Sequence, residues 1–146
     1  MDVNAKLETL LSQYGDGTGG NSPTREQWTR ILERDPGLPL TLINFFKFRE
    51  VAEYDKADQG DVSGEEAFQR YAEVSMPCMQ AAGGEFLAVA PFAGSMLGPD
   101  RDWDLVAIGK YPDLAAFLAL YENADYITAF AHRSAAVLKQ EVCVID

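Results

Sequence analysis

Residues that bind metals or form disulfides are scarce in this chain. It has one histidine, His132, and two cysteines, Cys78 and Cys143, among 146 residues. A zinc or iron site built from several histidines is excluded, because such sites need several nearby ligands. The cysteines lie far apart and match no CxxC spacing, so we interpret both as buried thiols in a reducing compartment, with a disulfide as the alternative. No metal or cofactor is expected, although a haem needs just one axial histidine.

Positive charge is also scarce. The chain has 12 Lys and Arg residues against 23 Asp and Glu residues, which gives a net charge of −11. Such an acidic protein is repelled by nucleic-acid phosphates and by anionic membrane surfaces, so neither is an expected partner. No apolar run approaches the roughly 18 residues of a membrane-spanning helix, and the N-terminus lacks a basic leader followed by an apolar stretch. The expected location is therefore the cytoplasm.

What the sequence does contain is typical of one globular domain. Hydrophobic residues make up 47% of the chain, close to the globular average, and the length fits a single domain. Residues 1–37 are predicted to be a helical extension, with two short amphipathic helices around a Gly-rich linker at 15–21. This linker is not a phosphate-binding loop, because it lacks the GK[ST] ending and a preceding strand. Residues 38–146 are predicted to form the α+β part of the domain.

From residue 39 onward the predicted elements follow the order β-α-β-β-α-β. A capping box at Ser63 opens the first helix, and Pro77 within this helix is expected to kink it or to start a new turn. The strands are predicted at residues 40–48, 85–97, 103–111 and 138–145. This order is the ferredoxin-like split motif, an α+β fold in which two helices lie on one face of a four-stranded antiparallel sheet.

The predicted strands carry apolar residues on both faces. In the first strand, Leu42 and Phe46 point to one side, and Ile43 and Phe45 point to the other. A sheet face left in water would alternate with polar residues, so something must cover the second face. We favour the same face of a second subunit, which gives a two-fold sheet-on-sheet barrel and a homodimer. The alternative is that residues 1–35 fold over this face as a lid.

Several segments, taken in their order and spacing, resemble a known family. These segments are LINFFKFR (42–49), GEEAFQRY (64–71) followed by Pro77 and Gly83-Gly84, WDLV (103–106) before Tyr111-Pro112, ADY (124–126) and His132-Arg133. They resemble the bacterial family known as domain of unknown function 1330 (DUF1330), within the dimeric α+β-barrel superfamily, over about residues 38–146. The resemblance implies a ferredoxin-like dimer and no established activity. The wider superfamily includes cofactor-free monooxygenases, muconolactone-isomerase-like enzymes, haem enzymes and ligand-binding modules, so the fold does not settle the function.

Four polar residues are candidates for a site. Asn44 sits in the middle of a strand, where its amide either donates to a ligand oxygen or forms a structural bond to the backbone of a loop. Arg49, on the same face as Lys47, either binds a carboxylate or forms ion pairs with acidic residues, which we favour in so acidic a chain. Tyr71 precedes Pro77 and either shapes a pocket between helix and sheet or lies beside a helix kink that has no function. His132 is a general-base candidate or an ordinary helix-face residue.

Three functions follow from these candidates. The first, which we favour, is a homodimeric module that binds a small, partly apolar molecule through Asn44, Arg49, Tyr71 and His132. The second is a cofactor-independent monooxygenase or isomerase, in which Asn44 stabilises an oxyanion and His132 is the catalytic proton shuttle. The third is a structural or interaction protein without a ligand. A hydrolase triad is not supported, because no serine lies in a GxSxG context.

Overall fold

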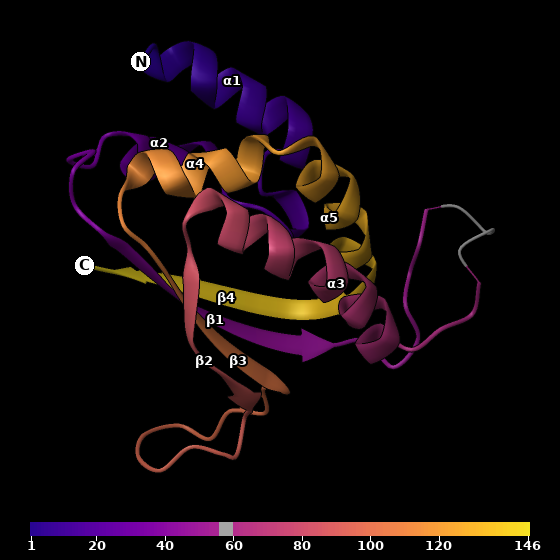
Figure 1. The fold of residues 1–146 in the computed structure, drawn as a ribbon. Coiled ribbons are helices and arrows are strands. Elements are labelled where there is room, and N and C mark those ends of the chain that lie inside the picture. The colour runs from indigo at the N-terminus through magenta and orange to yellow at the C-terminus, as the bar shows by residue number, and fades with distance from the viewer. Residues whose placement is uncertain (56–59) are drawn as a thin grey trace.

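The computed structural model describes residues 1–55 and 60–146 and shows an α+β fold (Figure 1). The predicted order, β-α-β-β-α-β after two N-terminal helices, is confirmed. The second helix of the motif is divided, because Asn123 ends one helix and caps the next by accepting hydrogen bonds from the backbone of Asp125 and Tyr126. The elements are α1 (Val3–Tyr14), η1 (Thr18–Gly20), α2 (Arg25–Leu32), β1 (Leu40–Phe48), α3 (Gly64–Ala82), β2 (Glu85–Pro91), β3 (Leu105–Tyr111), α4 (Leu114–Glu122), α5 (Ala124–Ala136) and β4 (Val137–Ile145).

The four strands form one antiparallel sheet in the order β2-β3-β1-β4. Strand β1 is interior, so that Asn44 lies opposite Ala107 on β3 and opposite Val142 on β4. Helices α3, α4 and α5 lie on one face of the sheet, which is the ferredoxin-like arrangement (Figure 1). No helix of the described residues covers the other face, which we call the outer face.

Side-chain caps fix where the helices begin. The Thr24 hydroxyl accepts a hydrogen bond from the Gln27 backbone at 3.2 Å, and the Gln27 side chain accepts one from the Thr24 backbone at 2.9 Å. This reciprocal pair satisfies two amides that the first turn of α2 leaves free. The Ser63 hydroxyl accepts from the Glu66 backbone at 3.0 Å in the same way at the start of α3. Pro77 does not end α3, which runs through it as a single helix.

Two predictions about the edges of the sheet are wrong. The strand predicted over 85–97 ends at Pro91, and residues 92–104 form a loop. Proline has no N–H with which to extend a ladder, so the chain leaves the sheet there. Cys143 is exposed rather than buried, because it lies on the edge strand β4, opposite Ile43 of the outer face. Cys78 on α3 is only partly buried.

The N-terminal helices pack on the helical side of the sheet and do not cover the outer face. Leu10 of α1 and Trp28 of α2 are 0% and 1% exposed, and they belong to the same core cluster as α4 and α5. The ring of Tyr14 meets that of Phe130 edge-on at 4.9 Å, and the ring of Trp28 meets that of Tyr121 at 5.3 Å. The alternative of a lid over the outer face is therefore wrong.

Candidate ligand-binding site

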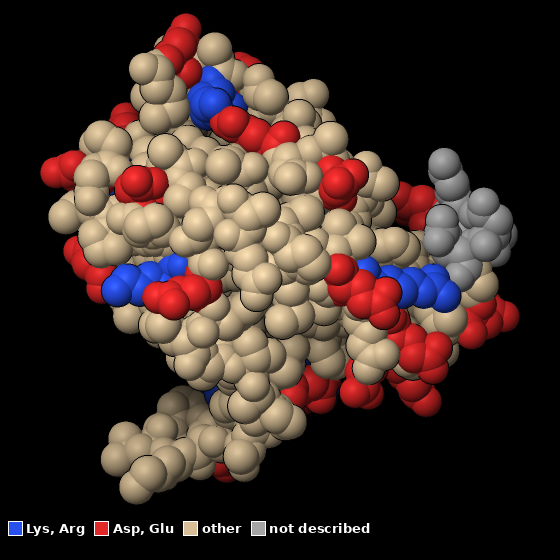
Figure 2. All heavy atoms as spheres, viewed as in Figure 1, with Lys and Arg blue, Asp and Glu red and all other residues tan. Residues whose placement is uncertain are grey.

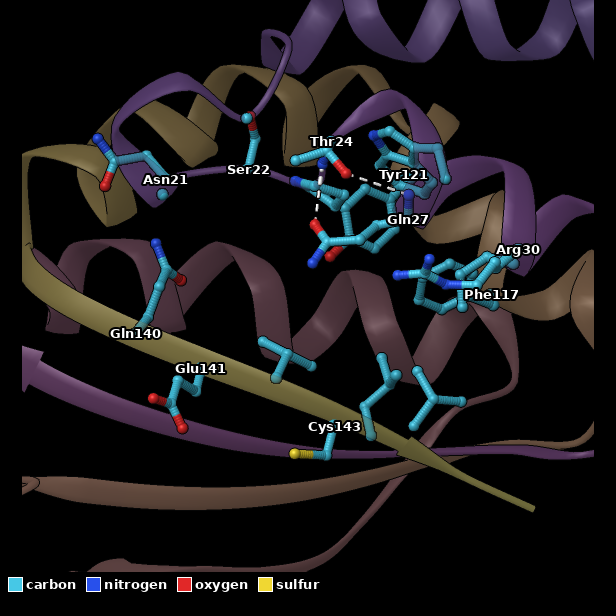
Figure 3. Close-up of a pocket in the computed structure, with 18 of the residues that line it drawn as sticks. Asn21, Ser22, Thr24, Gln27, Arg30, Phe117, Tyr121, Gln140, Glu141 and Cys143 are labelled. Carbon is cyan, nitrogen blue, oxygen red and sulfur yellow. Dashed lines mark hydrogen bonds between the residues drawn. The ribbon is translucent and has the colours of Figure 1, made fainter. Parts of the chain in front are cut away.

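A cavity of about 760 Å³ lies between β4 and the segment formed by α2 and the linker before it (Figure 3). Alternation along β4 decides which of its side chains face this space. Gln140 points up toward the linker, whereas Glu141 and Cys143 point to the opposite side of the strand (Figure 3). The apolar walls are formed by Ile31, Leu42, Phe117, Phe130, Val142 and Val144.

A second, smaller cavity of about 90 Å³ lies between α3 and the sheet. Asn44 and Tyr71 line it. Leu42, Tyr121 and Arg133 line both cavities, so the two spaces meet at these side chains. Arg133 is the charged member of the three, and its surroundings decide what the site can bind.

Arg133 is a cation buried among aromatic rings, with 7% of the residue exposed. Its Nη1 donates to the Tyr71 hydroxyl at 3.1 Å. Its Nε and Nη2 both donate to Oε1 of Gln140, at 3.1 and 2.8 Å. The guanidinium carbon lies 4.9 Å from the centre of the Phe46 ring and 5.2 Å from that of Phe130. These contacts hold the guanidinium in one place through cation–π attraction and hydrogen bonds.

The partners of Arg133 are all neutral. Among residues 1–55 and 60–146, no carboxylate forms an ion pair with it. Burial by itself lowers the pKa of Arg133, but the surrounding tyrosines, Tyr71 foremost, raise the pKa above its ordinary value, so the guanidinium stays charged. Burial also raises the pKa of Tyr126, whose hydroxyl lies 2.7 Å from that of Tyr71, so this phenol stays neutral.

The larger cavity also contains hydrogen-bond donors that have no acceptor. Trp28 Nε1, Arg34 Nε and Gln140 Nε2 are buried, belong to residues that line this cavity, and lack a partner in the part of the chain that the structure describes. Buried polar groups of folded proteins are nearly always hydrogen-bonded, to protein or to something bound. The cavity therefore offers a fixed positive charge and spare N–H groups beside an apolar wall.

The structure brings two of the four predicted site residues, Asn44 and Tyr71, together around the smaller cavity. The Asn44 amide donates to the carbonyl of Ala107 at 3.0 Å, which is a structural backbone bond, although the carbonyl belongs to strand β3 and not to a loop. Arg49 lines neither cavity and pairs with Glu53 at 3.2 Å. Lys47 likewise lies 3.5 Å from a carboxylate oxygen of Asp104, so ion pairing accounts for both of these basic residues.

His132 also lies apart from both cavities. Its Nδ1 is 2.7 Å from the hydroxyl of Tyr54, and Arg70 donates to the same hydroxyl at 3.4 Å. Burial, and then the positive charge of Arg70, lower the pKa of His132 below its ordinary value of 6.5, so the imidazole is neutral at pH 7. This hydrogen bond joins α5 to the segment that follows β1.

The residue that sequence reasoning missed is Arg133, which appeared there just as a neighbour of His132. A signal for it exists in the spacing of α5. Tyr126, Ala129, Phe130 and Arg133 follow one another at i, i+3, i+4 and i+7, and all four are buried. An arginine in register with an apolar stripe is expected to lie in the core. Charged side chains are rarely buried there unless they are paired, so such a position indicates a structural or functional role.

We expect acid to weaken the native state partly through His132. Because the pKa of this imidazole is lowered in the folded protein, the unfolded chain takes up the proton first as pH falls below 6.5. Stability from this group is therefore constant above pH 6.5 and is lost as pH falls toward the folded pKa. Urea unfolding at pH 8 and pH 5 should show a larger loss for the wild type than for His132→Gln. An equal loss in both proteins would contradict this assignment.

A family model shows the family to which the chain belongs. The family model for the domain of unknown function DUF1330 matches residues 54–146. The chain belongs to the DUF1330 family. The matched region leaves out β1, one of the two interior strands, and the N-terminal helices, so part of the larger cavity is formed by residues outside the region that matches the DUF1330 model.

Two crystal structures resemble this DUF1330 protein over most of its length. One is of the methylated RPA0582 protein, which is 30% identical with a TM-score of 0.78, over 86% of this chain and 92% of that chain. The other is of the RPA0582 protein of unknown function from Rhodopseudomonas palustris, 30% identical with a TM-score of 0.77, over 85% and 93% of the two chains. No curated protein matches the chain.

Membrane-spanning helices and clusters of metal-binding side chains are absent from the described residues. Within residues 1–55 and 60–146, no helix is long and apolar enough to cross a bilayer. No group of three or more His, Cys, Asp or Glu side chains in the same residues is placed to hold a metal ion. The cavity beside α2 thus remains the principal candidate site.

Proposed function

We propose that this DUF1330 protein binds a small, partly apolar molecule in the cavity beside α2. The observation that carries the proposal is a set of three buried donors, Trp28 Nε1, Arg34 Nε and Gln140 Nε2, which have no acceptor among the described residues and belong to residues that line one cavity with apolar walls. Small-molecule sites are commonly concave spaces of about 300–1,000 Å³, mostly apolar and with a few polar groups that fix the ligand. The cavity has this size and this composition.

The enzyme alternative receives less support from the geometry. That alternative needs His132 beside the bound molecule, and His132 lies outside both cavities with its Nδ1 engaged by Tyr54. Asn44, its oxyanion-stabilising partner, gives its amide to a backbone carbonyl. Binding rather than catalysis is therefore the function we propose.

Filling the cavity is expected to block binding. Val142→Trp places a large ring in the space, whereas Leu138→Trp places the same ring on the same strand at an exposed position that does not line the cavity. Using Nile red, a neutral apolar dye whose fluorescence rises on burial, we expect at least a tenfold weaker affinity for Val142→Trp, equivalent to about 1.4 kcal/mol. Leu138→Trp should bind like the wild type. Equal binding by both variants would show that the dye, and with it the proposed ligand, binds elsewhere.

We also propose that the protein is a homodimer joined through the outer face. Ile43, Phe45, Val106 and Ile108 form a half-buried apolar centre on this face, and no helix of the described residues covers it. The loop at 92–104 projects beyond the sheet on the side away from the helices (Figure 1). In Figure 2 this loop forms an arm whose visible surface is almost free of charge.

The loop favours a protein partner over solvent. Its Met96 and Leu97 are 103% and 92% exposed, which is unusual for two adjacent apolar residues. Lysines lie around the apolar centre of the outer face, at Lys47, Lys110 and Lys139, although the chain as a whole is strongly acidic. A second copy of the same chain supplies an apolar face that fits the apolar centre of this surface.

A further inference from the structure

We propose that the ligand of the larger cavity is a monocarboxylate with an apolar body, and that Arg133 binds its carboxylate. This inference rests on the proposed binding function and specifies the class of ligand. The starting observation is that Arg133 is a buried guanidinium whose hydrogen-bond acceptors, a phenol and an amide oxygen, carry no charge.

A buried charge without a counter-charge is costly for a fold. Buried arginines are normally paired with carboxylates, because the pair offsets the loss of hydration that each ion suffers alone. None of the carboxylates in residues 1–55 and 60–146 fills that place for Arg133. The counter-charge is absent from the described chain, although Arg133 lines a cavity large enough for a molecule to bring it.

Gln140 marks where a carboxylate oxygen would bind. Its Oε1 accepts from both Nε and Nη2 of Arg133, which is one edge of the guanidinium that carboxylates bind in bidentate pairs. The other end of the same amide, Nε2, has no acceptor among the described residues. The uncharged Oε1 of Gln140 thus occupies a position that a ligand carboxylate can take, and Nε2 of Gln140 can donate a hydrogen bond to that carboxylate.

The rest of the lining carries little negative charge. Trp28 Nε1 is a second buried donor without an acceptor in the described chain. The single acidic residue among the lining residues is Glu141, and its side chain points to the opposite side of β4 (Figure 3). Arg30 lines the cavity as well, and it is exposed. A carboxylate supplies a negative charge and acceptors for these donors, because it accepts through two oxygens and donates nothing.

Charge and shape together indicate one carboxylate on an apolar body. One buried guanidinium balances a single negative charge, whereas a phosphate with two charges would leave one unpaired in the core. The walls formed by Ile31, Leu42 and Val142 suit an aliphatic or aromatic chain. The cavity of about 760 Å³ is far larger than a short, fully polar acid would fill.

Calorimetric titration of the full chain with octanoate and with octanamide tests the inference. The two probes have the same apolar body and differ in charge, so an arginine-anchored site should bind octanoate at least tenfold more tightly. Arg133→Met keeps an unbranched side chain about as long as the aliphatic stem of arginine and removes the charge, and it should bring octanoate down to the affinity of octanamide. Arg101→Met is the matched control, because it removes an exposed arginine that lines neither cavity and should keep the preference for octanoate.

A second measurement on the wild type covers the case in which Arg133→Met fails to fold. The pKa of the octanoate carboxyl group can be followed by the NMR chemical shift of its ¹³C-labelled carbon. This pKa should be lower in the bound state than in free solution, because the guanidinium stabilises the ionised form. Equal affinities for the two probes, or an unchanged pKa, would overturn the inference. The Nile red result with Val142→Trp stands apart from these outcomes, because that dye carries no charge and reports on the cavity alone.

Discussion

Replacing Trp28 with alanine is expected to lower the free energy of unfolding by about 3–5 kcal/mol, the usual cost of removing a buried tryptophan. The side chain is 1% exposed, and its ring contacts those of Tyr14, Phe117 and Tyr121 at centroid distances of 6.4, 6.4 and 5.3 Å. It therefore joins α1 to α4 through α2. A domain of ordinary stability has about 5–15 kcal/mol in total, so this single change removes a large share of it.

Urea unfolding followed by circular dichroism measures this effect, with Leu38→Ala as the control. Leu38 belongs to the stretch between α2 and β1 and is 43% exposed, so its truncation should change stability by less than about 0.5 kcal/mol. The sequence predicted that residues 1–37 are an extension of a domain at 38–146. If they form one cooperative unit with the rest, Trp28→Ala unfolds in a single transition. A loss below about 1 kcal/mol, or a separate early transition, would show that the N-terminal helices are only loosely attached.

The parts of the fold that were predictable follow from local signals. The capping box at Thr24 and the side-chain cap at Ser63 fix helix starts through contacts between residues three apart, which a sequence displays directly. The order of the elements predicted a four-stranded antiparallel sheet, and the register confirms that β1 pairs antiparallel with both β3 and β4. Asn123 interrupts the last helical stretch for the same local reason, because its side chain caps α5.

The parts that were not predictable depend on contacts between distant segments. The strand at 85–97 was predicted too long because the apolar run Met96-Leu97 continues its pattern past Pro91, although these residues stand exposed on a loop. The position of α2 over β4 places Trp28 and Gln140 on one cavity, and no spacing in the sequence joins them. Arg133 was visible in the helical register of α5, but the lack of a carboxylate near it is a property of the folded chain.

Ile43→Glu is expected to dissociate the proposed homodimer. Ile43 lies at the middle of the outer face, opposite Ile108 on β3 and Cys143 on β4. Two-fold symmetry introduces a glutamate on each side of the interface, so two like charges are buried there in place of two apolar side chains. A buried charge without a partner costs about 3–5 kcal/mol, which corresponds to a dissociation constant at least about 100-fold higher.

Light scattering after gel filtration measures the outcome directly. The wild type should have twice the chain mass of 16.1 kDa, and Ile43→Glu should approach the mass of one chain. Val51→Glu is the control, because Val51 is 58% exposed in a loop outside the outer face and the same change there should leave the dimer intact. A wild type with the mass of a single chain would overturn the dimer, and a dimeric Ile43→Glu protein would place the interface elsewhere.

The same variant separates assembly from ligand binding. The larger cavity lies on the helical side of the sheet, between α2 and β4, whereas Ile43 points to the outer face. In the monomer the glutamate at position 43 is half-exposed and hydrated, so the chain should keep its fold and its circular dichroism spectrum. Monomeric Ile43→Glu should therefore bind Nile red as tightly as the wild type. A loss of dye binding together with dissociation would mean that the partner subunit completes the site, and the cavity of one chain would then be insufficient for the proposed function.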